Sequence, residues 1–512
     1  MSGEGVDATL TRLGMGPYQW RLLVLSGLGW AADNMWIQGI AITLPRLQYE
    51  WSIADRWIGV ATSALFAGMT LGSIAWGSCA DLYGRRFVFL RTLAVTAVLG
   101  AALSFAPSFA LVCALCFGVG TGVGGSMPTD GTLFLESIPK TKHFWLTALS
   151  VFFSLGSVVC ALIALVFLPG NSCTHTKPCR PGSANSGWRN VILALAGITA
   201  AFAFARLLPA SVHESPTYLV ATDQLDDACS AIEGISTANG EDSELYTEDM
   251  RAAHGRSPSA QDDAQEQDAM LGAGAEAHPD EASTRWSAIL ARYVPAAVAE
   301  RLHDLGQRAA PLFRAPHRRA VVLTWLLWAL ISLAFTMFNA FYPMYLQRKL
   351  GEHQAPEAGS SETKALYDYL WYAVSSVPGS LLGAALIESP LGRAKSLALA
   401  LLATAGAQLL FLAAEDAASV EFSGMGVSLA ATTAYAILYG YTPNVFPTSI
   451  RGTACAIASA LGRITGIAAP LLAGALLQVR VELAVMTSVA LFALCACTAL
   501  LLPSGTRAAV QL

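Results

Sequence analysis

Uninterrupted apolar segments of about 20 residues recur along most of the 512-residue chain. A helix of that length spans a bilayer, and in lipid every backbone polar group must find a partner, so only helices or a closed barrel can cross. The composition agrees, because 54% of the residues are hydrophobic and only 13% are charged, against about 25% in soluble domains. The continuous runs favour helices, so the sequence predicts an all-α, multi-pass membrane protein.

The apolar segments form two sets of six, which suggests an internal duplication. The first set covers 22–44, 57–79, 87–106, 109–135, 144–168 and 189–208, and the second covers 320–346, 369–388, 395–414, 422–446, 452–477 and 482–502. An even number of spans places both termini on one side of the membrane. Arg314, Arg318 and Arg319 precede the seventh span, and the positive-inside rule makes that side cytoplasmic.

We therefore expect a division into five parts. They are a cytoplasmic N-terminus (1–20), a six-helix bundle (21–208), a cytoplasmic linker (209–319), a second six-helix bundle (320–503) and a short cytoplasmic tail (504–512). In the linker, Tyr218 to Gly240 favours a short surface helix, whereas the Asp/Glu/Ala/Gly/Ser-rich stretch from Glu241 to Ala282 is typical of disorder.

Two cysteines lie in a polar loop rather than in a span. Cys173 and Cys179 fall between Pro169 and Trp188. If this loop is extracellular they can form a disulfide, and two free thiols are an equal alternative.

The loop after the second span has a distinctive pattern, GSCADLYGRR, with Gly77, Asp81, Gly84, Arg85 and Arg86. Glycines allow a tight turn and a close approach of helices, while the acid can cap the next element and pair with arginine. The corresponding loop of the second half reads IESPLGRAK, a decayed copy of the first, as a duplication predicts.

GSCADLYGRR resembles the signature loop of the major facilitator superfamily. From about Tyr18 to Pro503, apart from the acidic linker, the chain resembles the branch of synaptic-vesicle-glycoprotein-like proteins and organic-ion transporters. The resemblance is carried by YQWRLLVLSGLGWAAD, SMPTDGTLFLESIPK, GWRN, YTPNVFPTSIRGT and LGRITGIAAP. It implies two six-helix bundles around a central cavity, which rock between inward-open and outward-open states and bind solute near the midplane.

Two acids lie within the predicted spans. Asp33 matches an acid that the family places in the first span, and Asp130 stands in the fourth span where relatives carry an uncharged polar residue. An acid at mid-depth costs about 2.5–3.5 kcal/mol on an insertion scale, so it is expected to have a function. Burial disfavours the charged form, which makes both acids candidate proton carriers or ligands for a cationic group. The alternative is an acid capped by Asn34, Thr129 or the backbone.

Other candidates share the helices expected to line the cavity. Arg463 is expected to neutralise an acid, to hold a substrate carboxylate or to snorkel to the cytoplasmic surface, and Arg206 is expected to snorkel. Trp36, Tyr342 and Tyr439 are expected to line the cavity, with helix packing or an interfacial belt as the alternative.

The resemblance also implies a cytoplasmic charge network that locks the inner gate. Its first half is intact, with Asp81, Arg85, Arg86 and Glu136, and with Glu214 as a further member. In the second half Ser389 and Asn444 replace expected acids, Arg393 and Arg451 remain, and Glu388 is a substitute partner. We infer a weaker second-half lock and a less stable outward-facing state.

The chain contains no nucleotide-binding loop, metal-ligand spacing or enzymatic constellation, so we expect neither an enzyme nor a cofactor. Nothing in it indicates nucleic-acid binding, and no dimer motif argues against a monomer. The sequence predicts a secondary transporter that moves a small polar organic solute through the lipid bilayer with protons. The plasma membrane is the default location, and a vacuole or vesicle is the alternative. A sugar stays open as the solute because HESPTYL echoes a sugar-porter stretch. A receptor, scaffold or nutrient sensor that no longer transports is the alternative from another class.

Overall fold

The computed structural model describes residues 2–142, 145–172, 185–208, 212–241, 318–353, 360–387, 389–446 and 448–502. Within these ranges the regular elements are all helices. Cys173, Cys179, Glu388 and most of the linker lie outside the described residues, as do the side chains of Asn444 and Arg451. The predictions made for these positions therefore stay predictions.

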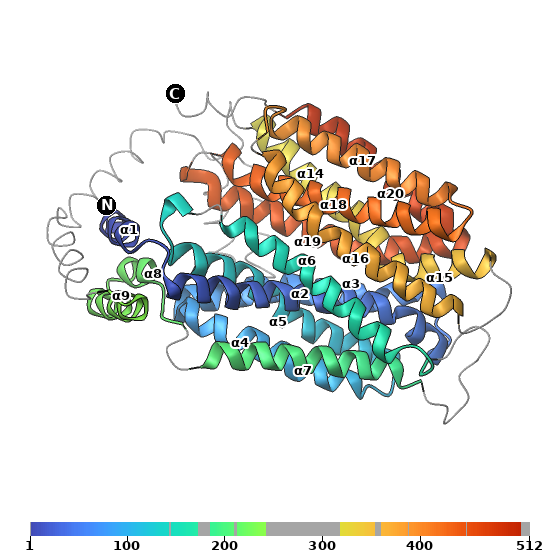
Figure 1. Ribbon diagram of the computed structural model, residues 1–512, viewed down its shortest axis with the longest axis horizontal. Helices are drawn as coiled ribbons and strands as arrows, with labels where there is room; N and C mark the ends of the chain where they lie inside the picture. The colour runs from blue at the N-terminus through green and yellow to red at the C-terminus, as the bar shows by residue number, and fades with distance from the viewer. Residues whose placement is uncertain are drawn as a thin grey trace, which may run out of the picture.

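In the described part of the chain, twelve membrane spans, of which the seventh is divided between two helices, form two bundles that lie side by side (Figure 1). The first bundle contains α2 (Pro17–Trp51), α3 (Asp55–Tyr83), α4 (Arg85–Ser104), α5 (Phe109–Glu136), α6 (Trp145–Phe167) and α7 (Gly187–Leu207). The second contains α14 (Arg318–Asn339), α15 (Tyr342–His353), α16 (Ser360–Ile387), α17 (Arg393–Ala413), α18 (Ala417–Val445), α19 (Thr448–Val479) and α20 (Val481–Leu500). The predicted fold of two six-helix bundles is confirmed.

The seventh span is divided between α14 and α15, which the sequence analysis treated as one helix. Pro343 is the second residue of α15. Its ring removes one backbone donor and clashes with a continuous helix, so the chain turns between Asn339 and Tyr342 before it continues. The turn sets α15 beside the first bundle.

Eleven helices of the described chain are long and apolar enough to cross a membrane, judged by length and composition. The first span, α2, is not among the eleven. Its 35 residues include Asp33, Asn34 and Gln38 in mid-helix, and these polar side chains dilute its apolar sequence. The helix is buried all the same, which points to polar partners inside the protein.

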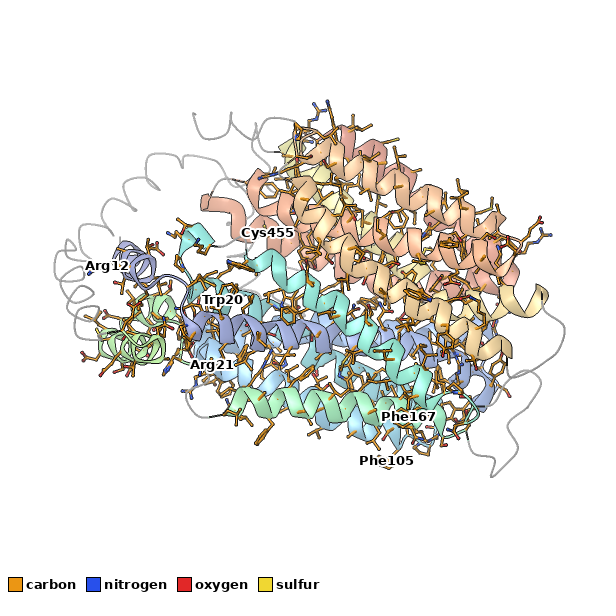
Figure 2. All side chains as sticks on the ribbon, in the orientation of Figure 1. Arg12, Trp20, Arg21, Phe105, Phe167 and Cys455 are labelled. Carbon is orange, nitrogen blue, oxygen red and sulfur yellow. The ribbon has the colours of Figure 1, made fainter. Side chains whose placement is uncertain are left out.

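Three shorter helices gather where α2 begins: α1 (Ser2–Leu13), α8 (Pro216–Ala221) and α9 (Leu225–Asn239). We call this the α9 end, and the opposite end of the bundles the α15 end (Figure 1). The helix predicted for Tyr218 to Gly240 is divided in two by a turn in which Asp223 has a φ of 61°. Asn239 of α9 accepts a hydrogen bond from the Tyr18 backbone N–H at 2.9 Å, so this cluster is fixed to the start of α2. Trp20 and Arg21, in the next turn of α2, are labelled in Figure 2.

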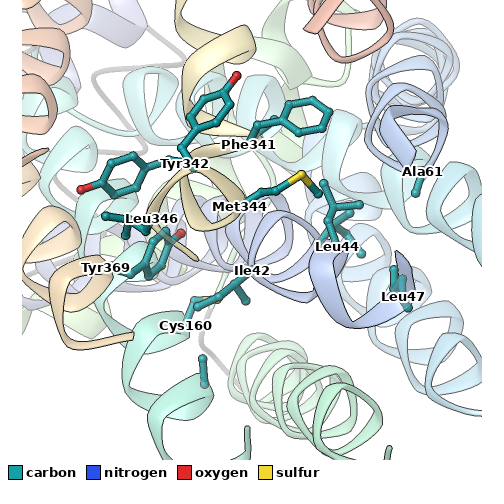
Figure 3. Packing of buried hydrophobic residues seen from close by; sticks show 14 of the residues in the cluster. Ile42, Leu44, Leu47, Ala61, Cys160, Phe341, Tyr342, Met344, Leu346 and Tyr369 are labelled. Carbon is teal, nitrogen blue, oxygen red and sulfur yellow. The ribbon is translucent and has the colours of Figure 1, made fainter. Parts of the chain in front are cut away.

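Toward the α15 end the two bundles are joined by polar contacts. Arg348 of α15 forms an ion pair with Asp55 of α3 at 2.7 Å. The Tyr369 hydroxyl of α16 donates to Gln38 Oε1 of α2 at 2.7 Å. Ser63 Oγ of α3 donates to the Ile467 carbonyl of α19 at 2.8 Å. Apolar side chains from both bundles pack between these contacts, including Ile42, Leu44, Cys160, Phe341, Met344 and Tyr369 (Figure 3).

Toward the α9 end the face of α3 that contacts α19 becomes open. At the α15 end this face of α3 packs closely against α19, as Gly59 shows: a Cβ on this residue would clash with the Pro470 carbonyl. Helical spacing continues the same face through Ser63 and Thr70 to Ile74 and Gly77. The Ile74 side chain is 65% exposed, and within the described part of the chain a Cβ on Gly77 would meet no atom within 4 Å. Among the described residues the bundles are therefore in close contact at the α15 end, whereas α3 makes no close contact at Gly77.

Candidate functional site

Asp33 lies in the middle of α2 with no exposed surface. Its Oδ1 accepts a hydrogen bond from Ser126 Oγ of α5 at 2.5 Å. Among the described residues its Oδ2 has no hydrogen-bond partner. The carboxylate is within electrostatic range of Asp130, Arg206 and Arg463. Asn34, proposed as a cap, binds elsewhere, because its amide donates to the Phe153 carbonyl of α6 at 2.7 Å. The arrangement leaves one buried carboxylate oxygen able to take a proton or a donor group.

Asp130 forms a buried ion pair with Arg206. Arg206 Nη2 lies 2.6 Å from Asp130 Oδ2, and neither side chain has exposed surface. The same guanidinium donates to the Phe89 carbonyl at 2.8 Å and to the Leu25 carbonyl at 3.2 Å, and it stacks over the Phe89 ring. The expectation that Arg206 snorkels is wrong, because α2, α4 and α5 together enclose it.

Gly29 explains how this ion pair can be enclosed. A Cβ at Gly29 would clash with both Asp130 Oδ2 and Arg206 Nη2. The glycine lets the backbone of α2 lie directly against the pair. Asp130 is thus neutralised within the first bundle, whereas Asp33 has no such partner in the described residues.

Arg463 approaches this region from the second bundle. Its Nη1 donates to the Met69 carbonyl of α3 at 3.3 Å, and it is within electrostatic range of both Asp33 and Tyr439. Tyr439 is 46% exposed and packs edge-on against Trp328 of α14 at 4.8 Å between ring centroids. Arg463, Tyr439 and Asp33 therefore lie near one another across the two bundles.

Two other aromatic candidates do not line the space between the bundles. Trp36 has no exposed surface, donates from Nε1 to Thr199 Oγ1 of α7 at 3.0 Å, and packs against Gly100 of α4. Tyr342 is likewise fully buried and stacks on Tyr372 at 4.2 Å between centroids. The prediction for Trp36 and Tyr342 is corrected, because each side chain points into the interior of its own half of the protein.

The signature loop forms a network at the α9 end that links α3, α4, α5 and the linker. Arg85 Nη1 donates to Asp81 Oδ1 at 2.8 Å, and Arg85 Nε lies 3.5 Å from Glu136 Oε2. The Glu214 carboxylate accepts from the backbone N–H groups of Arg85 and Arg86, at 2.8 and 3.1 Å. It caps the N-terminus of α4, where backbone N–H groups lack helical partners and the helix dipole favours an anion.

The two signature glycines have different surroundings. Gly84 has a φ of 95°, and a Cβ there would press on the Glu214 carboxylate, so the cap requires glycine. Gly77, expected to permit a close helix contact, makes none with the residues that the structure describes. In the second half, Gly392 repeats the turn with a φ of 79°, and Arg393 begins α17.

Two residues of the site were missed in the sequence: Ser126 as the partner of Asp33, and Arg206 as the partner of Asp130. A signal existed for both. Ser126 precedes Asp130 by one helical turn in SMPTD, and Arg206 is a cation inside an apolar span.

The sequence was also compared with models of known protein families. Residues 22–360 match the model of the Major Facilitator Superfamily. The chain belongs to the major facilitator superfamily. Its membership makes it a solute transporter and not an enzyme.

Several transporters of the superfamily are similar to this chain. An uncharacterised MFS-type transporter of Schizosaccharomyces pombe is 30% identical over 473 residues, covering 91% of this chain and 81% of that protein. Organic cation/carnitine transporter 7 of Arabidopsis thaliana is 26% identical, with 91% and 87% covered. Synaptic vesicle 2-related protein of Xenopus laevis is 25% identical, with 98% and 81% covered. The resemblance to the branch of synaptic-vesicle-glycoprotein-like and organic-ion transporters is confirmed.

The superfamily fold is also found in a solved structure. The inward-open conformation of the xylose transporter XylE from E. coli superposes with a TM-score of 0.66, with 12% identity and 96% and 98% of the two chains covered.

Proposed function

We propose that this protein is a proton-coupled secondary transporter for a small polar organic solute, and that Asp33 is its coupling acid. The observation that carries the proposal is the state of Asp33. It is a fully buried carboxylate with one hydrogen bond, next to a neutralised ion pair and within range of a cation on the opposite bundle. A proton on its second oxygen would remove a buried charge, so binding and release of a proton can be coupled to the environment of this site.

Arg463 supports coupling between protonation and bundle movement. Its electrostatic attraction to Asp33 holds only while α19 and α2 lie near each other, and its hydrogen bond to Met69 joins α19 to α3. Neutralising Asp33 would weaken the attraction between the bundles at this depth. A proton or a solute can shift such an equilibrium only by its difference in affinity for the two states.

The arrangement of the bundles fits one state of an alternating-access cycle. With the termini in the cytoplasm, closure at the α15 end and the exposed Ile74 side chain at the α9 end correspond to an inward-facing state. In an outward-facing state the α9 ends would approach, and Gly77 would allow α3 and α19 to come together. The predicted weakness of the second-half lock is consistent with this preference for facing inward.

The class of solute is proposed as an organic ion rather than a sugar. The names of the relatives include an organic cation/carnitine transporter, whereas the xylose transporter shares the fold at 12% identity. The HESPTYL stretch that left a sugar open has a structural role here, since Glu214 caps α4 and Ser215 Oγ accepts from the Tyr218 N–H at 3.1 Å. The plasma membrane and a monomeric state remain part of the proposal.

Uptake of labelled solutes tests the proposal. Cells expressing the wild type, Asp33→Asn or the control Asp227→Asn, an exposed acid of α9, would be given organic cations, carboxylates, amino acids and sugars with and without a protonophore. We expect one class to accumulate in the wild type and the control only while a proton gradient exists, and Asp33→Asn to lose that dependence. Gradient-driven uptake by Asp33→Asn would remove Asp33 from the mechanism. A surface-expressed wild type that neither imports nor, in loaded vesicles, exports any solute would favour the receptor or sensor.

A further inference from the structure

A second group of ionisable side chains lies in the other bundle, at the α15 end, where α16 and α18 begin. Lys364 and Asp368 are one turn apart on α16, and Glu421 faces them from α18. Lys364 Nζ lies 2.7 Å from Asp368 Oδ1 and 2.7 Å from Glu421 Oε2. Their side chains are 33%, 0% and 22% exposed, in the order Lys364, Asp368, Glu421. Lys364 and Glu421 thus form the rim of the group, and Asp368 lies beneath them.

In the described part of the chain the group has one more acid than it has cations. Two carboxylates share a single ammonium, and the Tyr342 hydroxyl of α15 lies within electrostatic range of both acids. A phenol supplies no positive charge at neutral pH. With both acids ionised, the group would hold a net charge of minus one around a fully buried carboxylate. Two carboxylates in one site resist full ionisation, and the fully buried Asp368 is the one placed to hold a proton.

The hydrogen bonds of the described residues also leave room for that proton. Lys364 divides its ammonium between the two acids, because it donates to Glu421 Oε2 at 2.7 Å and forms the ion pair with Asp368 Oδ1, whereas Asp368 Oδ2 has no hydrogen-bond partner among the described residues. The Tyr342 hydroxyl is buried without a partner as well. A buried acceptor without a donor costs about 1–3 kcal/mol. A proton on Asp368 would remove both the unpartnered acceptor and the surplus charge.

The position of the group connects it with the contact between the bundles. Tyr369 directly follows Asp368 and donates across the interface to Gln38 of α2. Gln38 in turn donates to Asn34 Oδ1 at 3.3 Å, and Asn34 adjoins Asp33. A protonation change at Asp368 would therefore act one residue away from one of the hydrogen bonds that join the bundles.

We propose that Asp368 is a second proton-binding site, which holds a proton beside the ion pair of Lys364 with Glu421. The site deepens the proposed proton coupling but does not depend on the transported solute. It gives each bundle one acid that can change its protonation.

The proton can be counted in the purified full-length protein without any solute. Infrared difference spectra between acidic and alkaline buffer report the carbonyl band of protonated carboxyl groups, and a pH indicator counts the protons released. The variants are Asp368→Asn, Glu421→Gln, Lys364→Met, Asp33→Asn and the control Asp416→Asn, an exposed acid at the start of α18. Each variant is compared with the wild type at equal protein concentration.

We expect Asp368→Asn to lose one proton and its band, whereas Asp416→Asn leaves both unchanged. Lys364→Met should hold one more proton than the wild type, because two acids then lack any counter-ion. Asp33→Asn should lose a different band, so the two sites are separable even if no uptake is ever found. An unchanged proton count in both Asp368→Asn and Lys364→Met would overturn the proposal. A count that falls as sodium chloride replaces choline chloride would overturn it in favour of a sodium site.

Discussion

Replacing Arg206 with methionine removes the cation from the most deeply buried ion pair described in the first bundle. Asp130 would keep its position between α2, α5 and α7 but would lose the guanidinium 2.6 Å away, and neither side chain has exposed surface. Water does not reach the Asp130 carboxylate, so solvation cannot offset its negative charge. Breaking a buried pair from one side costs about 3–5 kcal/mol. The Phe89 and Leu25 carbonyls lie within helices and keep their helical hydrogen bonds, so the loss of Arg206 as their donor adds little to this free-energy cost.

This loss should be visible as a lower melting temperature of the purified protein in detergent, followed by tryptophan fluorescence. At about 2–4 °C per kcal/mol for a unit of this size, Arg206→Met is expected to melt about 6–20 °C below the wild type. Arg91→Met, which removes an exposed arginine from α4, is the matched control. The double variant Asp130→Leu with Arg206→Met should recover most of the loss, because it leaves no buried charge.

The reasoning is refuted if Arg206→Met melts no lower than Arg91→Met. It is also refuted if the double variant is as unstable as the single one, since the cost would then come from lost packing rather than from the unpaired acid. A double-mutant cycle separates these two contributions.

Three further predictions concern the α9 end. Gly84→Ala should destabilise the protein by about 1–3 kcal/mol, because the residue has a φ of 95° and its Cβ would press on Glu214. Gly77→Ala is the control, because it lies in regular helix where a Cβ meets no described atom, and it should leave the melting temperature unchanged. Equal effects of the two variants on the melting temperature would contradict this account. Asn444→Glu should strengthen the second-half lock and favour the outward-facing state, so a cysteine reporter at Ile74 should label more slowly from inside; unchanged labelling would sink the idea. Burial and the nearby Arg86 and Arg21 lower the pKa of His213, so the folded protein binds fewer protons at this residue than the unfolded chain does. The free energy of unfolding should therefore fall as the pH drops below about 6.5. His213→Gln should flatten that part of the curve of stability against pH, and an unaltered curve would show that other groups cause the fall.

The elements of the fold were predictable because a span is a local property of the chain. Each span is a run of apolar residues whose backbone must satisfy itself, and this requirement acts within about 20 residues. The turns of the signature loops were equally local, since Gly84 and Gly392 both adopt the positive φ that glycine favours. The break before α15 was missed because Pro343 lies in a run that is otherwise apolar enough to continue.

The candidate site could be predicted only in part. Asp33 is unusual in any apolar helix, and its burial follows from its place in the first span. Whether the Trp36 side chain faces the neighbouring bundle depends on its angular position around α2. Three residues correspond to about 60° from Asp33, which is enough to turn the indole from the neighbouring bundle toward Thr199 of α7.

The sequence by itself determined that this chain crosses a membrane in two sets of six helices, because the bilayer imposes the same requirement on every span. It also identified Asp33 and Asp130 as acids inside apolar spans, but it did not place Arg206 in the interior. Only the tertiary structure decided how they pair. Asp130 meets Arg206 across 76 positions of sequence, and the surplus acid at Asp368 is apparent only once α18 brings Glu421 beside Lys364. In a low-dielectric interior a charge interacts strongly only with groups that helix packing places within a few ångströms. That distance depends on the tertiary structure and cannot be derived from neighbouring residues in the sequence.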